Sequence, residues 1–261
     1  MLLVADVGNT NSTFGVYHHG DPHPIATART ATQHDRMPDE WYAILEPVLT
    51  MQGVSLQQID GFVLSSVVPS VTRWLGVLAK HRLRIEPVIV SAALDLGLPI
   101  DADNPAEVGA DRIVNSLAAL DAYGAPVISI DFGTAVNFDI VDHRGHYLGG
   151  ALAPGLVIAL EAMTSRAAKL FSVDLVPPPA AIGTNTITAI QSGLVLGYIS
   201  LVEGMIVRLA AELQGTPTVV VTGGYAELFA KNSAMIDHYD PDLTINGLRL
   251  VWERVKGATP E

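Results

Sequence analysis

Residues 3–20, LVADVGNTNSTFGVYHHG, and residues 128–145, ISIDFGTAVNFDIVDHRG, carry one pattern twice, so that Asp6 corresponds to Asp131 and Gly8 to Gly133. In each copy an apolar run leads into Asp-x-Gly, and an alternating run and a polar turn follow. This pattern is typical of a β-hairpin with a buried first strand. One Asp-x-Gly alone is explained by ordinary turn chemistry. Two copies in register predict two similar halves with a cleft between them, where we expect the functional site.

The composition limits what kind of protein this is. A length of 261 residues suits one large domain or two smaller ones, and we expect halves at 1–115 and 116–261. A formal charge of −12 argues against a nucleic-acid partner, because binding to a phosphate backbone needs a basic face. The absence of cysteine excludes disulfides and thiolate catalysis. No basic leader is seen and no apolar run approaches a membrane span, so we expect no membrane partner and a cytoplasmic location.

Helices and strands alternate after the opening hairpin, which is typical of a mixed α/β architecture. Pro38 with two acids behind it indicates a helix start, and Gly53 a helix end. The same pattern analysis predicts a buried strand at 61–68, helices at about 107–123, 186–213 and 247–255, and a strand, double-glycine turn and helix within 218–229.

The first Asp-x-Gly turn has the composition of a phosphate site. Gly8 lets a phosphate approach the backbone, and residues 9–13 (NTNST) offer many small hydrogen-bonding groups. The carboxylate of Asp6 repels a phosphate unless a cation bridges the two. Asp131 and Thr134 supply the same chemistry from the second copy. Together the two turns predict a phosphotransfer site.

Two further stretches can be interpreted in two ways. In VGADR at 108–112, Asp111 is either a helix-capping acid or the base for a substrate hydroxyl, and Arg112 is a clamp for a carboxylate or phosphate. The glycines of Thr222-Gly223-Gly224 either let a helix start or an adenine ring pack close to the sheet or form a simple tight turn.

Several motifs, in this order, resemble the type III pantothenate kinase family: DVGNTNST at 6–13, NPAEVGADR at 104–112, DFGTA at 131–135, GGALAPGL at 149–156 and IGTNTITAIQSG at 182–193. The resemblance implies an α/β fold of duplicated ribonuclease-H-like halves, as in actin-like ATPases, each a mixed sheet flanked by helices. It implies ATP-dependent phosphorylation of pantothenate, the first step of coenzyme A biosynthesis. It also implies a homodimer that uses ATP with Mg²⁺ and a monovalent cation, K⁺ or NH₄⁺.

The resemblance also assigns roles to residues at the matching positions. The ATP-binding set is Asp6, Val7, Gly8, Asn9, Thr10, Asn11, Ser12, Thr13 and Thr134. The pantothenate-binding set is Gly109, Ala110, Asp111, Arg112 and Thr186. Asp111 of the second set is the proton acceptor, and Asp131, outside both sets, is the ligand of the monovalent cation.

The chain departs from the family at two places. Ala102 stands where the family usually has a tyrosine, and residues 167–171 read AAKLF where the family more often has Thr-Ala-x-Leu-Pro. A different class of function is a non-catalytic, ATP-binding accessory or regulatory relative of the same fold, which loss of Asp111 or Asp131 would have favoured; both are present. A sugar kinase or a phosphatase acting on polyphosphate would need another substrate segment in place of 109–112.

Overall fold

The computed structural model describes residues 1–166 and 172–257, and the AAKLF departure lies outside them. The chain divides into two compact units, Met1–Asp121 with Asp242–Glu261, and Ala122–Pro241. The C-terminal segment therefore packs with the first unit. The division of the chain into halves at residues 1–115 and 116–261 stays a prediction.

The first unit is built on a mixed five-stranded sheet in the order β3-β2-β1-β4-β5. Its strands are β1 (Leu2–Val7), β2 (Asn11–Tyr17), β3 (Ala26–Ala31), β4 (Gly61–Ser66) and β5 (Val88–Ile89). Strands β1, β2 and β3 pair antiparallel, and β4 pairs parallel to both β1 and β5. The predicted opening hairpin is confirmed.

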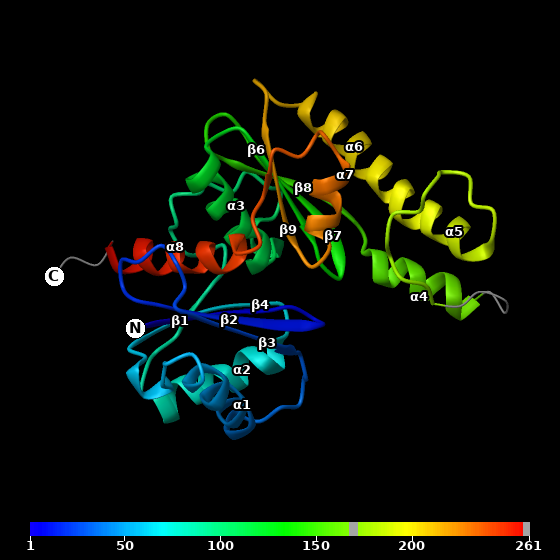
Figure 1. Ribbon diagram of the computed structural model, residues 1–261. Coiled ribbons are helices and arrows are strands. Elements are labelled where there is room, and N and C mark those ends of the chain that lie inside the picture. Colours follow the sequence, from blue (N-terminus) through cyan, green and yellow to red (C-terminus); the bar gives the residue numbers. More distant parts are fainter. Residues whose placement is uncertain (167–171, 258–261) are drawn as a thin grey trace. The chain divides into compact units, whose positions relative to one another are not determined.

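Helices cover both faces of this sheet (Figure 1). On one face, α1 (Pro38–Thr50) and α2 (Pro69–Leu78) pack with alternate residues of β1 and β2, such as Leu3, Ala5 and Phe14. On the other face lies α8 (Leu243–Gly257), against Val4 and Gly15. Short turns η1 (Leu56–Gln58), η2 (Ala79–Leu83) and η3 (Pro105–Glu107) join these elements.

Helix α3 (Ala110–Tyr123) begins later than its sequence pattern predicts. The predicted start was near Glu107, but residues 105–107 form a separate 3₁₀ turn. The helical hydrogen bonds begin at Gly109, whose carbonyl accepts from Arg112 and Ile113. This later start places Asp111 in the first turn of the helix.

The second unit repeats the architecture with the strand order β10-β9-β6-β7-β8. Its strands are β6 (Val127–Phe132), β7 (Ala135–Val141), β8 (Tyr147–Pro154), β9 (Thr218–Gly223) and β10 (His238–Tyr239). Strands β6, β7 and β8 pair antiparallel, and β6, β9 and β10 pair parallel, which reproduces the pairing of the first sheet. The second predicted hairpin is confirmed as well.

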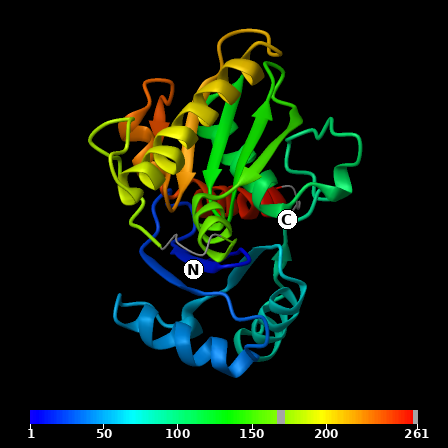
Figure 2. The same ribbon diagram turned by 90° about the vertical axis from the view of Figure 1, so that its right-hand side faces the viewer.

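The helices of the second unit form two groups. Helix α7 (Ala226–Asn232) and α6 (Gly197–Ala210) pack on the sheet, and Figures 1 and 2 show α6 running along one sheet face. Helices α4 (Leu156–Arg166) and α5 (Thr186–Gln191) meet in a small separate core of Leu160, Ile190 and Leu194. A π-helical turn, η4 (Ser192–Leu196), joins α5 to α6.

One finding corrects an expectation about apolar segments. The continuous helix Thr186–Ala210 has 25 residues and is, by length and composition alone, long and apolar enough to cross a membrane. The expectation that no apolar run approaches this length is therefore wrong. Core helices of soluble proteins meet the same criterion, and Ile199, Val202 and Ile206 pack in the core of the second unit. We interpret this helix as a partly buried core helix of that unit.

Candidate active site

The first glycine turn joins β1 to β2 and is closed by its own backbone. The N–H of Gly8 donates to the carbonyl of Asn11 at 3.0 Å. A Cβ at Gly8 would lie 3.3 Å from that same carbonyl oxygen, so a side chain there would crowd the turn. Asn9, Thr10 and Asn11 are exposed on its outer side. The turn is thus tight on the inside and polar on the outside.

Asp6 precedes this turn and lies in a row of polar residues across the sheet. Its partners in register are Thr13 on β2 and Ser65 on β4. The hydroxyl of Ser65 donates to Oδ1 of Asp6 at 2.9 Å. Ser65 is not among the residues predicted from the sequence, although a strand that is apolar from 62 to 64 and then ends in two serines is a usable signal.

Asp111, in the first turn of α3, acts on Asp6 through its charge. Burial and then the negative charge of Asp111 raise the pKa of Asp6 from 3.8 to about 7, against the opposing hydrogen bond from Ser65. Burial also raises the pKa of Asp111 itself, while the backbone and charge of Arg112 lower it. The first unit therefore brings together two carboxyl groups that both hold protons more tightly than usual.

Gly109 leaves room for the carboxylate of Asp111 in its present position. A Cβ at Gly109 would lie 2.5 Å from Oδ1 of Asp111. The same oxygen accepts the backbone N–H of Arg112 at 3.0 Å. The predicted segment 109–112 is thus a compact helix start that holds the carboxylate of Asp111 in place.

The second unit holds the second glycine turn and Asp131. The N–H of Gly133 donates to the carbonyl of Ala135 at 3.0 Å, as Gly8 does in the first turn. Gly223, with φ +97°, lies so close that a Cβ there would be 2.5 Å from Oδ1 of Asp131. Gly223 therefore lies where a side chain would collide with Asp131 and with the backbone of Phe132. Both interpretations of the Thr222-Gly223-Gly224 stretch remain predictions.

The predicted site residues fall into three places. Residues 6–13 and 109–112 belong to the first unit, and Asp131 on β6 and Thr134 in the turn between β6 and β7 belong to the second. Thr186 is also in the second unit, but it is exposed at the start of α5, whose buried residues pack with α4 in the small separate core. Among the residues that the structure describes, no group of three or more His, Cys, Asp or Glu is arranged to hold a metal ion.

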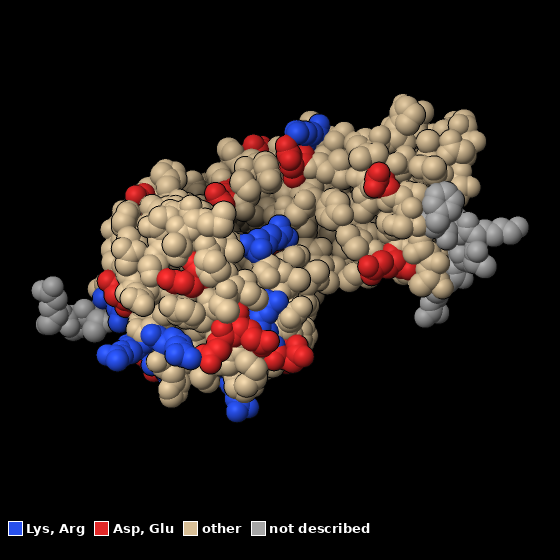
Figure 3. Space-filling view, turned by 60° about the horizontal axis from the view of Figure 1, so that its bottom comes forward, with Lys and Arg blue, Asp and Glu red and all other residues tan. Residues whose placement is uncertain are grey.

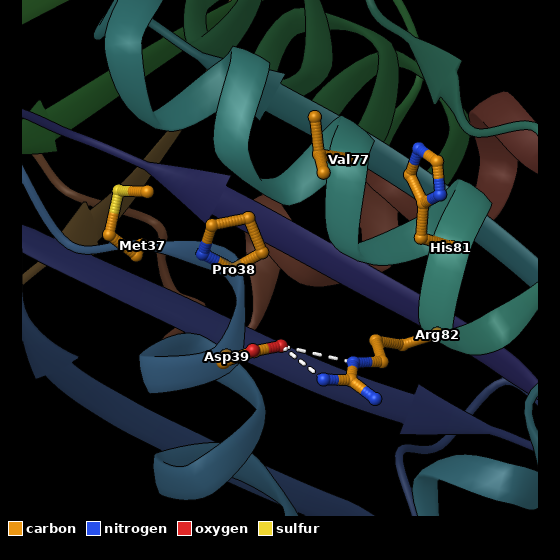
Figure 4. Close-up of a pocket in the computed structure, with 6 residues that line it drawn as sticks. All are labelled: Met37, Pro38, Asp39, Val77, His81 and Arg82. Atoms are coloured by element: carbon orange, nitrogen blue, oxygen red, sulfur yellow. Dashed lines mark hydrogen bonds and ion pairs between the residues drawn. The ribbon is translucent and has the colours of Figure 1, made fainter.

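Two hollows of the first unit lie away from these residues. One of about 410 Å³ is lined by Met37, Pro38, Asp39, Val77, His81 and Arg82 (Figure 4). The second, of about 430 Å³, shares Asp39 and Arg82 with it. These two side chains form an ion pair of 2.7 Å and so satisfy each other. Neither hollow contains a predicted site residue.

Comparison with known proteins identifies the family. The family model described as type III pantothenate kinase matches residues 2–208. A type III pantothenate kinase of Thermomicrobium roseum is 48% identical over 255 residues, which span 98% of each chain. The chain belongs to the type III pantothenate kinase family. A type III pantothenate kinase of Moorella thermoacetica is 45% identical over 97% of this chain and 99% of the relative. The predicted activity, ATP-dependent phosphorylation of pantothenate at the start of coenzyme A biosynthesis, is confirmed at the level of the family.

Solved structures show the fold of this pantothenate kinase. Component A of the (R)-2-hydroxyglutaryl-CoA dehydratase of Acidaminococcus fermentans matches with a TM-score of 0.58 and 15% identity over 99% of both chains. The activator of the 2-hydroxyisocaproyl-CoA dehydratase of Clostridium difficile, with bound ADPNP, matches with a TM-score of 0.52 and 11% identity over 100% of this chain and 98% of that one. The predicted fold of duplicated actin-like halves is confirmed.

The raised pKa of Asp6 predicts that this residue destabilises the unliganded protein. Between pH 4 and 7 the folded state keeps a proton on Asp6 that the unfolded state has lost, so the free energy of unfolding falls as the pH rises. We expect Asp6→Asn to exceed the wild type in melting temperature by on the order of 5 °C at pH 8 and by little at pH 4.5. The measurement is a series of thermal melts without nucleotide or divalent cation.

Asp60→Asn is the matched control. Burial raises the pKa of Asp60, but hydrogen bonds from the N-terminus and His19 outweigh it, so the pKa of Asp60 lies below its usual value. This carboxylate stabilises the fold above its pKa, so its loss should lower the melting temperature at neutral pH. A melting temperature of Asp6→Asn that stays below the wild type at every pH would contradict the environment described for Asp6.

Proposed function

We propose that Asp111 is the general base of the kinase reaction. It takes the proton from the primary hydroxyl of pantothenate as that oxygen bonds to the γ-phosphorus of ATP, and the bond from this phosphorus to the bridging oxygen of ADP breaks. The observation that carries the proposal is the electrostatic coupling of Asp111 to Asp6, which lies next to the glycine turn. The raised pKa of Asp111 supports it further, because a more basic carboxylate accepts a proton more readily.

The glycine turn at residues 6–13 is proposed to hold the phosphates of ATP, with Thr134 as a further contact. Asn9, Thr10 and Asn11 are exposed on this turn, and we propose that they meet a phosphate. Ser12 is fully buried and hydrogen-bonded within the protein. Its contribution is therefore to the shape of the turn.

The carboxylates near the proposed phosphate site call for two cations, Mg²⁺ and a monovalent ion. Two carboxyl groups near a triphosphate repel it, and Mg²⁺ bound to ATP and positioned by Asp6 would relieve this repulsion. For the monovalent cation we propose Asp131. The chemistry of its neighbours fits such an ion, because a Cβ at Gly223 would lie 2.5 Å from Oδ1 of Asp131 and 2.7 Å from the carbonyl oxygen of Phe132, and carboxylate and carbonyl oxygens are the ligands that such cations prefer. When bound, the cation supplies positive charge that favours the phosphates.

Pantothenate is proposed to bind over the start of α3. The guanidinium of Arg112 suits the carboxylate of pantothenate, and Gly109 and Ala110 keep the helix start small. Thr186 of the second unit is proposed as a further contact. Ala102 lacks the hydroxyl that the family's tyrosine offers, so another group must supply that contact or the contact is lost.

Removal of the proposed base should greatly slow turnover without weakening the binding of ATP. We expect Asp111→Asn to lower kcat by about 10²–10⁴-fold while the Kd for ATP changes little, because base catalysis has this magnitude. The measurement pairs a coupled ADP-release assay with calorimetric titration of ATP. Asp121→Asn, on the same helix but paired with Arg254, serves as the control with near-normal turnover. Near-normal kcat in Asp111→Asn would rule out the role, and wild-type protein that binds ATP without turnover would support a non-catalytic relative.

The proposed cation site predicts a dependence on potassium. Activity should rise steeply with KCl or NH₄Cl and hardly with NaCl at equal ionic strength, and Asp131→Asn should lose this response. Initial rates over a titration of each salt provide the measurement. Full activity of the wild type in sodium-only buffer would count against the assignment.

We also propose that the protein acts as a cytoplasmic homodimer through an apolar surface of the second unit. Leu148 and Leu152 on the edge strand β8 and Val157 and Ile158 on α4 are exposed, and Leu152 keeps 65% of its surface. Between Leu148 and Ser165 the sequence has one charged residue, Glu161. In Figure 3 the part of the second unit with α4 and α5, at the right of the view, is mostly uncharged. Contiguous exposed apolar surface is typical of an interface, and a second copy is the commonest partner.

A charge in this surface should separate the subunits. We expect Leu152→Glu to shift the protein from dimer to monomer in analytical ultracentrifugation, because a dimer would bury the new carboxylate. Val48→Glu, at an exposed position of α1 in the first unit, should leave the dimer intact. A wild type that sediments as a monomer at micromolar concentration would refute the proposed dimer.

A further inference from the structure

A residue outside every motif discussed above makes three hydrogen bonds to the first glycine turn. Thr32 follows β3, and its hydroxyl donates to the carbonyl of Gly8 at 2.8 Å. Its hydroxyl oxygen is also 2.8 Å from that of Ser12, and its N–H donates to the carbonyl of Thr10 at 2.9 Å. One side chain and its backbone thus contact the turn at three of its residues.

These bonds determine which way the peptide groups of the turn point. In a trans peptide the C=O of one residue and the N–H of the next point in opposite directions. Because the carbonyls of Gly8 and Thr10 point at Thr32, the N–H groups of Asn9 and Asn11 point away from it. Thr32 therefore fixes the directions of the N–H groups of Asn9 and Asn11. It does so from the inner side of the turn, where Ser12 is buried.

Thr32 is itself held by the core of the first unit. The guanidinium of Arg36, only 9% exposed, lies 4.6 Å from the ring of Trp41 and donates to the carbonyl of Ala31 at 3.5 Å. Trp41 is fully buried, with its ring 5.8 Å from that of Phe14 on β2. The end of β3 is therefore attached to α1 and β2, so Thr32 has a rigid support.

We propose that Thr32 is a positioning residue for ATP, which presets the glycine turn without touching the nucleotide. This inference rests on the proposed function, in which the turn binds the phosphates. It assigns part of the ATP affinity to the segment between β3 and α1, where no phosphate-binding pattern exists in the sequence. A preorganised turn loses less conformational freedom on binding than a loose one, so the effect should appear in ATP affinity.

The test replaces the hydroxyl while keeping the volume of the side chain. Thr32→Val removes the bonds to Gly8 and Ser12, and we expect the KM for ATP to rise about 5–30-fold, from the usual contribution of such bonds, with the KM for pantothenate unchanged. Thr32→Ser restores the hydroxyl and should restore most of the ATP affinity. Thr27→Val, at an exposed position of β3, is the matched control and should behave as the wild type.

The outcomes separate this proposal from the one on which it rests. An unchanged KM for ATP in Thr32→Val would overturn it, and so would equal losses for both substrates that Thr32→Ser does not rescue. Gly8→Val tests the turn itself, since its side chain would crowd the carbonyl of Asn11. If Gly8→Val weakens ATP binding and Thr32→Val does not, only the role of Thr32 fails. If Gly8→Val binds ATP normally, the turn is not the phosphate site and both proposals fail.

Discussion

The burial of the carboxyl groups of Asp6 and Asp111, with the negative charge of Asp111 acting on Asp6, is the constraint on which the proposed chemistry depends. Both groups have lost part of their water, and each resists ionisation in the unliganded protein. Because the pKa of Asp6 is about 7, a cation that binds nearby would shift this carboxyl group toward its charged form at neutral pH. The first unit thus carries an electrostatic cost that binding of a cation with the nucleotide would relieve.

The duplicated sheet produces two different carboxylate environments from one pattern. Asp6 is in register with Ser65 and Asp131 with Thr222, so each has a hydroxyl residue on the neighbouring parallel strand. Asp6 also has the charge of Asp111 nearby, and Oδ1 of Asp131 would lie 2.5 Å from a Cβ at Gly223. The separate roles proposed for Asp6 and Asp131 draw on these particular neighbours, because the two hairpins themselves are alike.

The sequence predicts the parts of the fold that local patterns determine. The two hairpins follow from alternation and repetition, and the helix start at Pro38 is found where expected. Local patterns do not determine long-range packing, so the sequence does not predict that α8 packs with the first unit. Ser65 and Thr32 were missed for the same reason: each acts on a residue more than twenty positions away. Roles that depend on such contacts can be predicted from a sequence only through resemblance to a family.

The most direct test of the account is a stoichiometric assay of the intact protein with Mg²⁺, K⁺ and ATP, in which released ADP and the phosphorylated product are quantified together with and without pantothenate. The account predicts that ADP appears only when pantothenate is present, with one 4′-phosphopantothenate formed for each ADP. ADP release at the same rate without pantothenate, or release without this product, would contradict it.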